Sequence, residues 1–186
     1  ATNTIRNINP DWIGGVRNKF NYKNVSLGFL IDTQKGGDIF SLDMYYGLAT
    51  GLYKETAIGD IRENGILNAG VAPDGTPNTV KTQSPGTFSN NYGYLVQPNK
   101  AFVYDASYVK LREVSITFNF PKSMFERSFI KDASLSLLGS NLWIISKNLP
   151  YADPESGLSS GSRSRGYSIG SLPTTRDIGF NLTFKF

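Results

Sequence analysis

The sequence predicts an all-β protein, and two observations support this fold class. Aromatic residues are plentiful, with 12 Phe and 10 Tyr among 186 residues, Gly is frequent at 19, and charged residues make up only 18%. Several stretches also alternate apolar and polar side chains with a period of two, as strands with one apolar face do. Strands joined by Gly-bearing turns fit this composition better than helices rich in Ala, Glu and Lys.

Five segments of the sequence have strand character. They are expected over residues 11–22, 25–32, 107–120, 132–146 and 174–186. The first two form a predicted hairpin (11–32) around a tight turn at 22–24, where an Asn tolerates the positive φ that such turns need. Pro121 ends the third strand because it has no backbone donor. In the fourth strand the alternation is lost at Leu137 and Leu138, where we expect a bulge.

The connections between these segments alternate in length. The second and third strands are separated by a region over 33–104, which we expect to be irregular apart from a helical turn or two within 41–56. The connection over 147–173 is also long, whereas a short turn closes each hairpin, the second hairpin spanning 107–146. This alternation is expected of a transmembrane β-barrel, in which periplasmic turns are short and extracellular loops are long.

Aromatic residues fall where a membrane barrel needs them. If the long loops lie outside the cell, two Trp residues are near the extracellular ends of strands and the other aromatics near the periplasmic ends. The predicted aromatic girdle comprises Trp12, Phe20, Tyr22, Phe118, Phe120 and Trp143. Such girdles mark both interfaces of a membrane barrel. The alternative is that aromatics simply favour strands and fill the core of a soluble, carbohydrate-binding β-sandwich.

Five strands are too few to close a membrane barrel, because the smallest such barrels have about 8. An unclosed sheet would leave backbone groups unsatisfied in lipid. We therefore expect the chain to be the C-terminal part of a larger antiparallel barrel, with residues 174–186 as its closing strand and the N-terminal strands absent.

Composition argues against several other functions. There is no Cys and no His, which removes disulfide frameworks, His- or Cys-ligated zinc and Ser-His-Asp triads. An enzyme is therefore less favoured than either a membrane-barrel protein or a soluble carbohydrate-binding β-sandwich. We expect no catalytic residue, metal or cofactor. The acidic residues Asp38, Asp43, Asp153 and Glu155 do not match the spacing of a calcium loop. The net charge of +4 is spread along the chain, so no nucleic-acid partner is expected.

Several sequence blocks resemble one family of outer-membrane proteins. The blocks DASYVKLREVSITFNFPKSMF (105–125), GSNLW (139–143) and YADPESG (151–157), with the terminal aromatic strand, look like the C-terminal end of SusC/RagA-type receptors. These receptors are TonB-dependent transporters of Bacteroidetes. The stretch NPDWIGGVRNKFNYKNVSLGFLIDTQKGGDIFS (9–41) resembles the preceding hairpin of that family, whereas residues 45–104 give no such match.

The resemblance implies a 22-stranded barrel with an N-terminal plug, the plug being absent from this chain. It also implies import of oligosaccharides or peptides across the outer membrane of a Gram-negative bacterium. The implied partners are the remaining barrel and plug of the same receptor, a SusD-like lipoprotein, the TonB complex acting through the missing N-terminal part, the substrate and outer-membrane lipid.

The final strand carries a candidate assembly signal. Gly179, Leu182 and Phe184 match the Gly-x-x-apolar-x-apolar pattern of outer-membrane assembly signals, and Phe186 extends it by one alternation. We expect the barrel-assembly machinery to bind this strand by β-augmentation. The same residues also suit a purely lipid-facing role.

Two further groups of residues are candidates for contacts inside and above the barrel. Polar residues expected to line the lumen, and to pair across neighbouring strands rather than contact substrate, are Arg17, Lys19, Asp32, Glu113, Asn119, Asn181 and Lys185. Loop aromatics that suit contact with a ligand or a lid protein, or packing within the loop, are Tyr45, Tyr46, Tyr53, Phe88, Tyr92 and Tyr94. Arg163 and Arg165 lie in a Gly/Ser-rich loop and are expected to be solvated.

Overall fold

The computed structural model describes residues 7–59, 61–67, 69–82, 97–155 and 165–186. The chain divides into two compact units. The first, which we call the sheet unit, comprises residues 7–37, 105–149 and 172–186. The second, which we call the loop unit, comprises the described residues of 38–104 and 150–171. In the sequence, the loop unit is therefore formed by two insertions between strands of the sheet unit.

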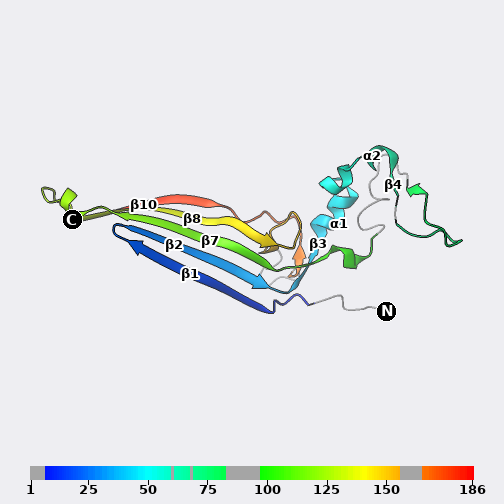
Figure 1. Ribbon diagram of the computed structural model, residues 1–186, viewed down its shortest axis with the longest axis horizontal. Coiled ribbons are helices and arrows are strands. Elements are labelled where there is room, and N and C mark those ends of the chain that lie inside the picture. Colours follow the sequence, from blue (N-terminus) through cyan, green and yellow to red (C-terminus); the bar gives the residue numbers. More distant parts are fainter. Residues whose placement is uncertain (1–6, 60, 68, 83–96, 156–164) are drawn as a thin grey trace. The chain divides into compact units, whose positions relative to one another are not determined.

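The sheet unit is an antiparallel five-stranded sheet (Figure 1). Its strands are β1 (Trp12–Tyr22), β2 (Val25–Lys35), β7 (Tyr108–Asn119), β8 (Asp132–Lys147) and β10 (Asp177–Lys185). They follow one another in the order β1-β2-β7-β8-β10, and each pair of neighbours is antiparallel. A short 3-10 helix, η4 (Lys122–Met124), lies in the turn between β7 and β8. The predicted all-β fold class is confirmed.

The strands match their predicted ranges to within three residues at each end. The turn between β1 and β2 differs from prediction, because Lys23 and not Asn24 has the positive φ, at 50°. Tyr22 pairs with Val25, so the turn contains two residues, and the first of them adopts the left-handed conformation. This conformation is uncommon for a residue other than Gly, Asn or Asp.

The bulge predicted at Leu137 and Leu138 is wrong. Pairing of β8 with both neighbours runs through these two residues without a shift, and they lie on opposite faces of the sheet. The register instead shifts further along, where Leu111 pairs with Trp143 but Glu113 pairs with Ser140. The loss of alternation at 137–138 arises because Leu138 is an apolar residue on the otherwise polar face.

The loop unit contains more regular structure than the irregular region expected over 33–104. Three short strands, β3 (Asp38–Ser41), β6 (Val103–Asp105) and β9 (Tyr167–Ser168), form a sheet in the order β6-β3-β9. The helices are α1 (Leu42–Ala49), η1 (Lys54–Ala57), α2 (Ile61–Asn64) and η3 (Asn99–Phe102). A small hairpin pairs β4 (Ile66–Leu67) with β5 (Lys81–Thr82). The helix predicted within 41–56 is confirmed by α1 and η1.

The loop unit is organised around helix α1. The Ser41 side chain caps this helix by accepting a hydrogen bond of 3.1 Å from the Met44 backbone N–H. Met44, Leu48 and Phe102 are buried together, and the side chains packed against them are Phe40, Tyr45, Tyr53 and Tyr104. Strands β3 and β9 pair in parallel, so the two long connections between sheet strands form one folded unit.

Among the described residues, no helix is both long and apolar enough to cross a membrane.

Candidate functional site: the two faces of the sheet

One face of the sheet unit is apolar across all five strands. Cross-strand pairing aligns a continuous row formed by Phe20, Leu27, Ile116, Leu137 and Phe180. The exposed fractions of these side chains range from 40% for Leu27 to 75% for Phe180. Directly paired side chains lie on the same side of a sheet, so the row forms an apolar band perpendicular to the strands.

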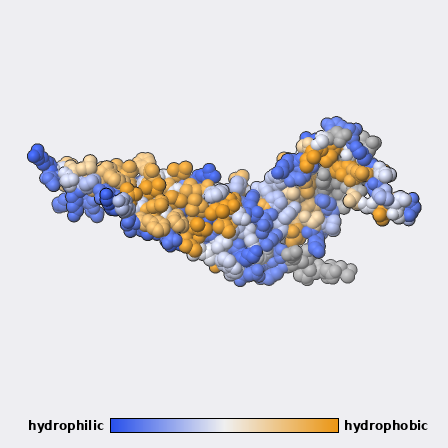
Figure 2. Space-filling model, in the orientation of Figure 1, coloured by the Kyte–Doolittle hydropathy of each residue, from blue (hydrophilic) through white to orange (hydrophobic). Residues whose placement is uncertain are grey.

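A second apolar row lies next to the first, towards the short turns. It comprises Tyr22, Val25, Phe118, Leu135 and Leu182. Figure 2 shows the hydrophobic residues gathered over the sheet unit. Soluble monomeric proteins rarely expose a contiguous apolar surface of this kind, which normally marks contact with another protein or with lipid.

The predicted girdle residues lie at or near strand ends. Trp12 opens β1 and is 53% exposed, and Trp143 lies near the end of β8 and is 60% exposed. Both lie at the end of the sheet from which the long connections leave. The remaining girdle residues lie at the opposite ends of the strands, where the two hairpin turns are; we call this end of the sheet the short-turn edge. They are Phe20, Tyr22, Phe118 and Phe120. The aromatic side chains therefore lie towards the two ends of the strands, and their role as a membrane girdle stays a prediction.

The turn between β7 and β8 adds aromatic rings that sequence reasoning missed. The ring centroids of Phe118 and Phe120 are 5.1 Å apart, and those of Phe120 and Phe125 are 6.4 Å apart. Phe129 stacks on Phe186 with centroids 5.6 Å apart and an interplanar angle of 11°. Periodicity pointed only to strand residues, although the Phe content of residues 121–131 was visible in the sequence.

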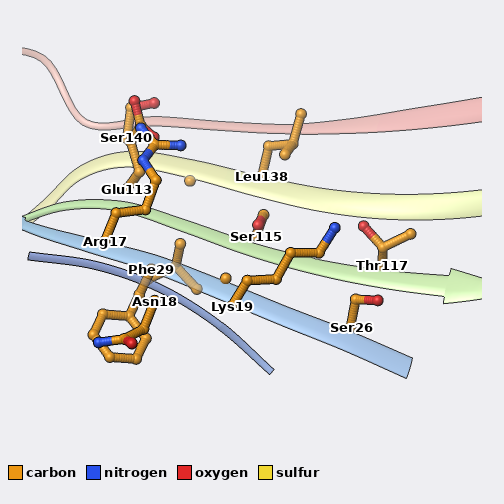
Figure 3. Close-up of a pocket in the computed structure, with 13 residues that line it drawn as sticks. Arg17, Asn18, Lys19, Ser26, Phe29, Glu113, Ser115, Thr117, Leu138 and Ser140 are labelled. Atoms are coloured by element: carbon orange, nitrogen blue, oxygen red, sulfur yellow. The ribbon is translucent and has the colours of Figure 1, made fainter. Parts of the chain in front are cut away.

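The opposite face of the sheet is polar and hollowed. Arg17, Lys19, Glu113 and Ser115 contribute to a cavity of about 450 Å³ on this face. In Figure 3 these side chains lie on one side of the strands, whereas Asn18 and Phe29 point to the other side.

Small residues leave room for this cavity. Gly28 pairs with Ser115, and a Cβ atom at Gly28 would lie only 2.7 Å from the Ser115 Oγ. A larger residue at position 28 would therefore displace its neighbour on β7. Ser26 and Thr117 also line the cavity, so the polar face consists largely of short side chains between longer charged ones.

Several of the predicted lumen residues form ion pairs across strands. Arg17 on β1 donates to Glu113 on β7 at 2.8 Å, reaching over β2, and both side chains are exposed. Lys185 pairs with Asp132 at 3.2 Å. Lys19 lines the cavity, Asn181 accepts a hydrogen bond from Thr183, and Asn119 ends β7.

Arg112 is the polar-face residue that sequence reasoning missed. Its Nε donates to the Asp32 carboxylate at 3.2 Å, a second guanidinium nitrogen donates to the same carboxylate oxygen, and Nη1 donates to Asn141 Oδ1 at 3.0 Å. Asn141 has a positive φ of 50° and in turn donates to the Thr175 carbonyl at 3.1 Å.

A bulge places Arg112 on this face. Leu30 pairs with Glu113 and Ile31 pairs with Leu111, so Arg112 is an extra residue in β7 relative to β2. Simple alternation would have placed Arg112 on the apolar face with Val114. A charged residue at a position where the alternation of β7 expects an apolar one was therefore the sequence signal for this bulge.

Three of the candidate assembly-signal residues, Gly179, Leu182 and Phe184, lie on β10, and Phe186 directly follows it. Strand β10 pairs only with β8 among the described strands. Leu182 and Phe184 belong to the apolar face, where they pair with Leu135 and Ala133. Gly179 pairs with Leu138 on the polar face, and a Cβ atom there would meet nothing within 4 Å. The other edge of β10 is thus open to a further strand.

The loop aromatics differ in their surroundings. The ring of Tyr45 packs within the loop unit, 5.1 Å from Phe102 and 5.7 Å from Phe40 between centroids. Tyr46 is 54% exposed. The ring of Tyr53 stacks on Tyr151 at 4.2 Å. Phe88, Tyr92, Tyr94 and Arg163 lie outside the described residues, and Arg165 is exposed.

Tyr151 joins the two insertions that form the loop unit. Its hydroxyl donates to the Glu55 carboxylate, 2.8 Å from each oxygen. Hydrogen bonding from the Glu55 backbone N–H, and then from this hydroxyl, lowers the pKa of Glu55 below its ordinary value. Burial raises the pKa of Tyr53, with the nearby Asp43 carboxylate as the next cause. The cluster of Tyr53, Glu55 and Tyr151 therefore favours an ionised Glu55 beside protonated phenols.

The acidic residues of the loop unit have structural partners. Asp43 accepts hydrogen bonds from the Ser168 hydroxyl and from the Gly170 backbone N–H, the latter at 2.7 Å. Asp153 accepts from the Glu155 backbone N–H at 3.0 Å. Within the described part of the chain, no group of three or more His, Cys, Asp or Glu side chains is arranged to hold a metal ion.

The sheet unit has the structure of a wall segment from a membrane β-barrel. Its strands are antiparallel and consecutive, its apolar face is exposed, and its opposite face is polar. In barrels of this kind, lipid-facing and lumen-facing residues alternate along each strand.

Comparison with known proteins supports the same class. The chain is 28% identical to TonB-dependent receptor P26 of Formosa agariphila over 94% of its length, and 26% identical to TonB-dependent receptor P3 of the same bacterium over 95%. It spans 17% and 16% of those two proteins, respectively. No protein-family model matches the sequence.

Solved structures with a similar fold include the RagAB peptide importer in its closed-closed state and the RagAB peptide transporter. The TM-score is 0.67 for each, with sequence identities of 18% and 19%. Each match covers 96% of this chain and 18% of the larger one. The predicted resemblance to SusC/RagA-type TonB-dependent receptors is confirmed, and the relatives are named as receptors and transporters rather than as enzymes.

Proposed function

We propose that this chain forms part of the barrel wall of a TonB-dependent nutrient importer in the outer membrane of a Gram-negative bacterium of the Bacteroidetes. The observation that carries the proposal is the pair of exposed apolar rows that cross all five strands. Lipid is the partner that such a surface requires, and the polar face then lines the lumen, against the plug or water.

The full receptor then imports oligosaccharides or peptides together with a SusD-like lipoprotein. The TonB complex supplies the energy through the plug of the same receptor. The ion pairs on the polar face give the lumen wall a fixed pattern of charge, while the exposed Lys19 remains available to water or the plug.

The loop unit is the part of the chain that we propose to contact the lipoprotein or the substrate. It is a folded unit with its own buried core, so it offers a defined surface rather than a flexible strand of chain. Apolar side chains on that surface are Tyr46, Leu52 and Ile58, of which Leu52 is 72% exposed. Aromatic and apolar side chains of this kind suit both a protein partner and a sugar or peptide ligand.

We also propose that the barrel-assembly machinery binds β10. Its outer edge carries unpaired backbone groups among the described strands, and an unpaired edge is the substrate of β-augmentation. Gly179, Leu182, Phe184 and Phe186 provide the sequence pattern for that recognition. In the complete receptor, the same edge is then free to close the barrel against another strand.

A deletion and complementation experiment tests the importer proposal. The gene for the full receptor is deleted in its bacterium, and growth is measured on oligosaccharide or peptide mixtures as the sole nutrient. We expect growth on one of the two to be lost, to be restored by the intact receptor, and to require TonB. Growth that is unaffected on both classes would contradict the importer function.

A solubility measurement separates this proposal from the soluble β-sandwich alternative. The isolated chain is expressed without detergent and examined by size exclusion and thermal unfolding. We expect aggregation, because the apolar rows lack lipid. A monomer that unfolds cooperatively would favour the sandwich.

A further inference from the structure

The short-turn edge of the sheet unit carries a cluster of exposed cations. They are Lys23 in the β1–β2 turn and Lys122, Arg127 and Lys131 in the β7–β8 turn. None of the four forms an ion pair with another described residue, and Glu126 is the one unpaired carboxylate in these two turns. Lys185 and Asp132, at the same edge, form an ion pair at 3.2 Å.

Exposed aromatic and apolar side chains accompany these cations. Phe129, stacked on Phe186, is 77% exposed, and Met124 is 63% exposed. The Lys23 Nζ lies 5.4 Å from the centroid of the Tyr22 ring, which is 73% exposed. Each of the two turns therefore combines a basic group with an uncovered aromatic ring.

The β7–β8 turn holds these side chains in a defined backbone structure. Within it, Met124 donates to the Pro121 carbonyl at 3.0 Å, and Ser128 donates to the Phe125 carbonyl at 2.8 Å. At its end, the Lys131 backbone N–H donates to the Lys185 carbonyl at 2.7 Å, which extends the pairing of β8 with β10. The turn is thus an ordered continuation of the sheet.

We propose that this edge binds the headgroups of anionic phospholipids in the leaflet where the short turns emerge. The inference rests on the membrane position given under the proposed function. Amphipathic aromatic rings sit at the headgroup level of a bilayer, and Lys and Arg side chains extend from apolar surface to the charged headgroups. Basic residues next to a bilayer attract anionic lipid in this way.

Continuity with the apolar face favours lipid over a soluble acidic partner. The row that contains Tyr22, Phe118 and Leu182 lies directly next to these turns. Phe120 and Phe125 carry the aromatic surface on from the strand into the turn. An anionic phospholipid has a negatively charged headgroup and acyl chains in the same molecule, so it contacts the cations and the apolar row together.

Native mass spectrometry of the purified full receptor tests the proposal. The receptor is titrated with phosphatidylglycerol or with phosphatidylcholine, and bound lipid is counted for the wild type and for the K122Q/R127Q/K131Q variant. We expect the wild type to prefer phosphatidylglycerol and the variant to lose that preference, with affinity falling on the order of tenfold or more.

A matched control removes the same charge from the loop unit. Lys54, Lys81 and Lys100 are exposed there, and the K54Q/K81Q/K100Q variant is expected to retain phosphatidylglycerol like the wild type. Soluble glycerol phosphate is added as a competitor, and we expect it to displace no lipid. Displacement at concentrations equal to the lipid would show that a free anion suffices, and it would overturn the membrane assignment.

Equal binding of both lipids, or equal loss in both triple variants, would also overturn the proposal. Outer-membrane fractionation and nutrient uptake of the same variants keep this outcome distinct from failure of the proposed function. A receptor that inserts and imports without lipid preference refutes only the headgroup site. A wild-type receptor that is absent from the outer membrane refutes the membrane position itself.

Discussion

The sheet unit and the loop unit use the same side chains in opposite ways. In the sheet unit Phe180 is 75% exposed, whereas in the loop unit Phe102 is fully buried. The loop unit collects its aromatics around Met44 and Leu48, as a water-soluble domain does. The sheet unit points its aromatics outwards and keeps short polar residues on its other face. The contrast is what we expect from the proposed membrane position, in which the loop unit faces water and the sheet unit faces lipid.

The largest expected effect concerns the core of the loop unit. Phe102→Ala removes a fully buried ring that contacts Phe40 and Tyr45, so we expect it to destabilise the loop unit by about 3–5 kcal/mol. In the full receptor this is measured as faster proteolysis within 38–104, with the barrel still resistant to unfolding in detergent. Leu52→Ala, at a side chain that is 72% exposed, serves as control. Equally fast proteolysis of both variants would contradict a packed apolar core in the loop unit.

The next effect tests the two faces of the sheet unit. Phe180→Arg places a charge in the apolar row, and we expect it to lower the stability of the barrel by up to about 2–4 kcal/mol, the cost of a charge at the membrane midplane. Asn181→Arg places the same charge one residue along, on the polar face, where we expect little loss. The measurement is the outer-membrane level and the heat-modifiable mobility of the full receptor. If Asn181→Arg proved as harmful as Phe180→Arg, the assignment of the faces would be wrong.

A smaller effect compares two ion pairs within the polar face. The side chains of Arg112 and Asp32 are 20% and 23% exposed, whereas those of Arg17 and Glu113 are 68% and 48% exposed. Solvent screens the exposed pair, so Arg17→Gln should lower the free energy of unfolding by about 0–1 kcal/mol. Arg112→Gln leaves a partly buried carboxylate with weaker donors and should lower the free energy of unfolding by about 1–3 kcal/mol. Denaturant unfolding of the receptor compares the two variants, and the reverse order would contradict this reading.

Most of the sheet unit was predictable because alternation is a local property of the sequence. The five strands follow from runs in which every second residue is apolar, and the turn at Pro121 follows from a missing backbone donor. Where a bulge interrupts the alternation, periodicity fails. Arg112 therefore needed the structure, since its side chain reaches the polar face only through the register shift between Leu111 and Glu113.

The loop unit was less predictable because its stability comes from contacts distant in sequence. Strand β9 has two residues and is recognisable only by its pairing with Phe40 and Ser41, more than 120 positions earlier. From the sequence, Tyr45 and Tyr53 are candidates for ligand or lid contact as well as for packing within the loop. The structure places both in packed clusters of aromatic rings. Neither arrangement leaves a periodic pattern in the sequence.

The smallest effect we predict concerns the hydrogen bond that joins the two insertions. Tyr151→Phe keeps the stack on Tyr53 and removes the hydroxyl that donates to Glu55. Because the pKa of Glu55 is lowered in the folded state, ionised Glu55 favours folding at pH values above its ordinary pKa of about 4.5. This contribution fades as the pH falls through the lower, folded-state pKa. We therefore expect proteolysis of the wild-type loop unit to accelerate below pH 4.5.

The Tyr151→Phe variant should show a weaker acceleration in acid, since the Glu55 carboxylate loses one of its donors and keeps only the backbone N–H and the nearby charge of Lys54. An acid-active protease, with cleavage mapped by mass spectrometry, measures this in the full receptor. Tyr22→Phe, in the sheet unit, should leave the pH dependence of the loop unit unchanged. An equally steep acid dependence in Tyr151→Phe and wild type would show that the hydrogen bond between Tyr151 and Glu55 does not help to hold the two insertions together.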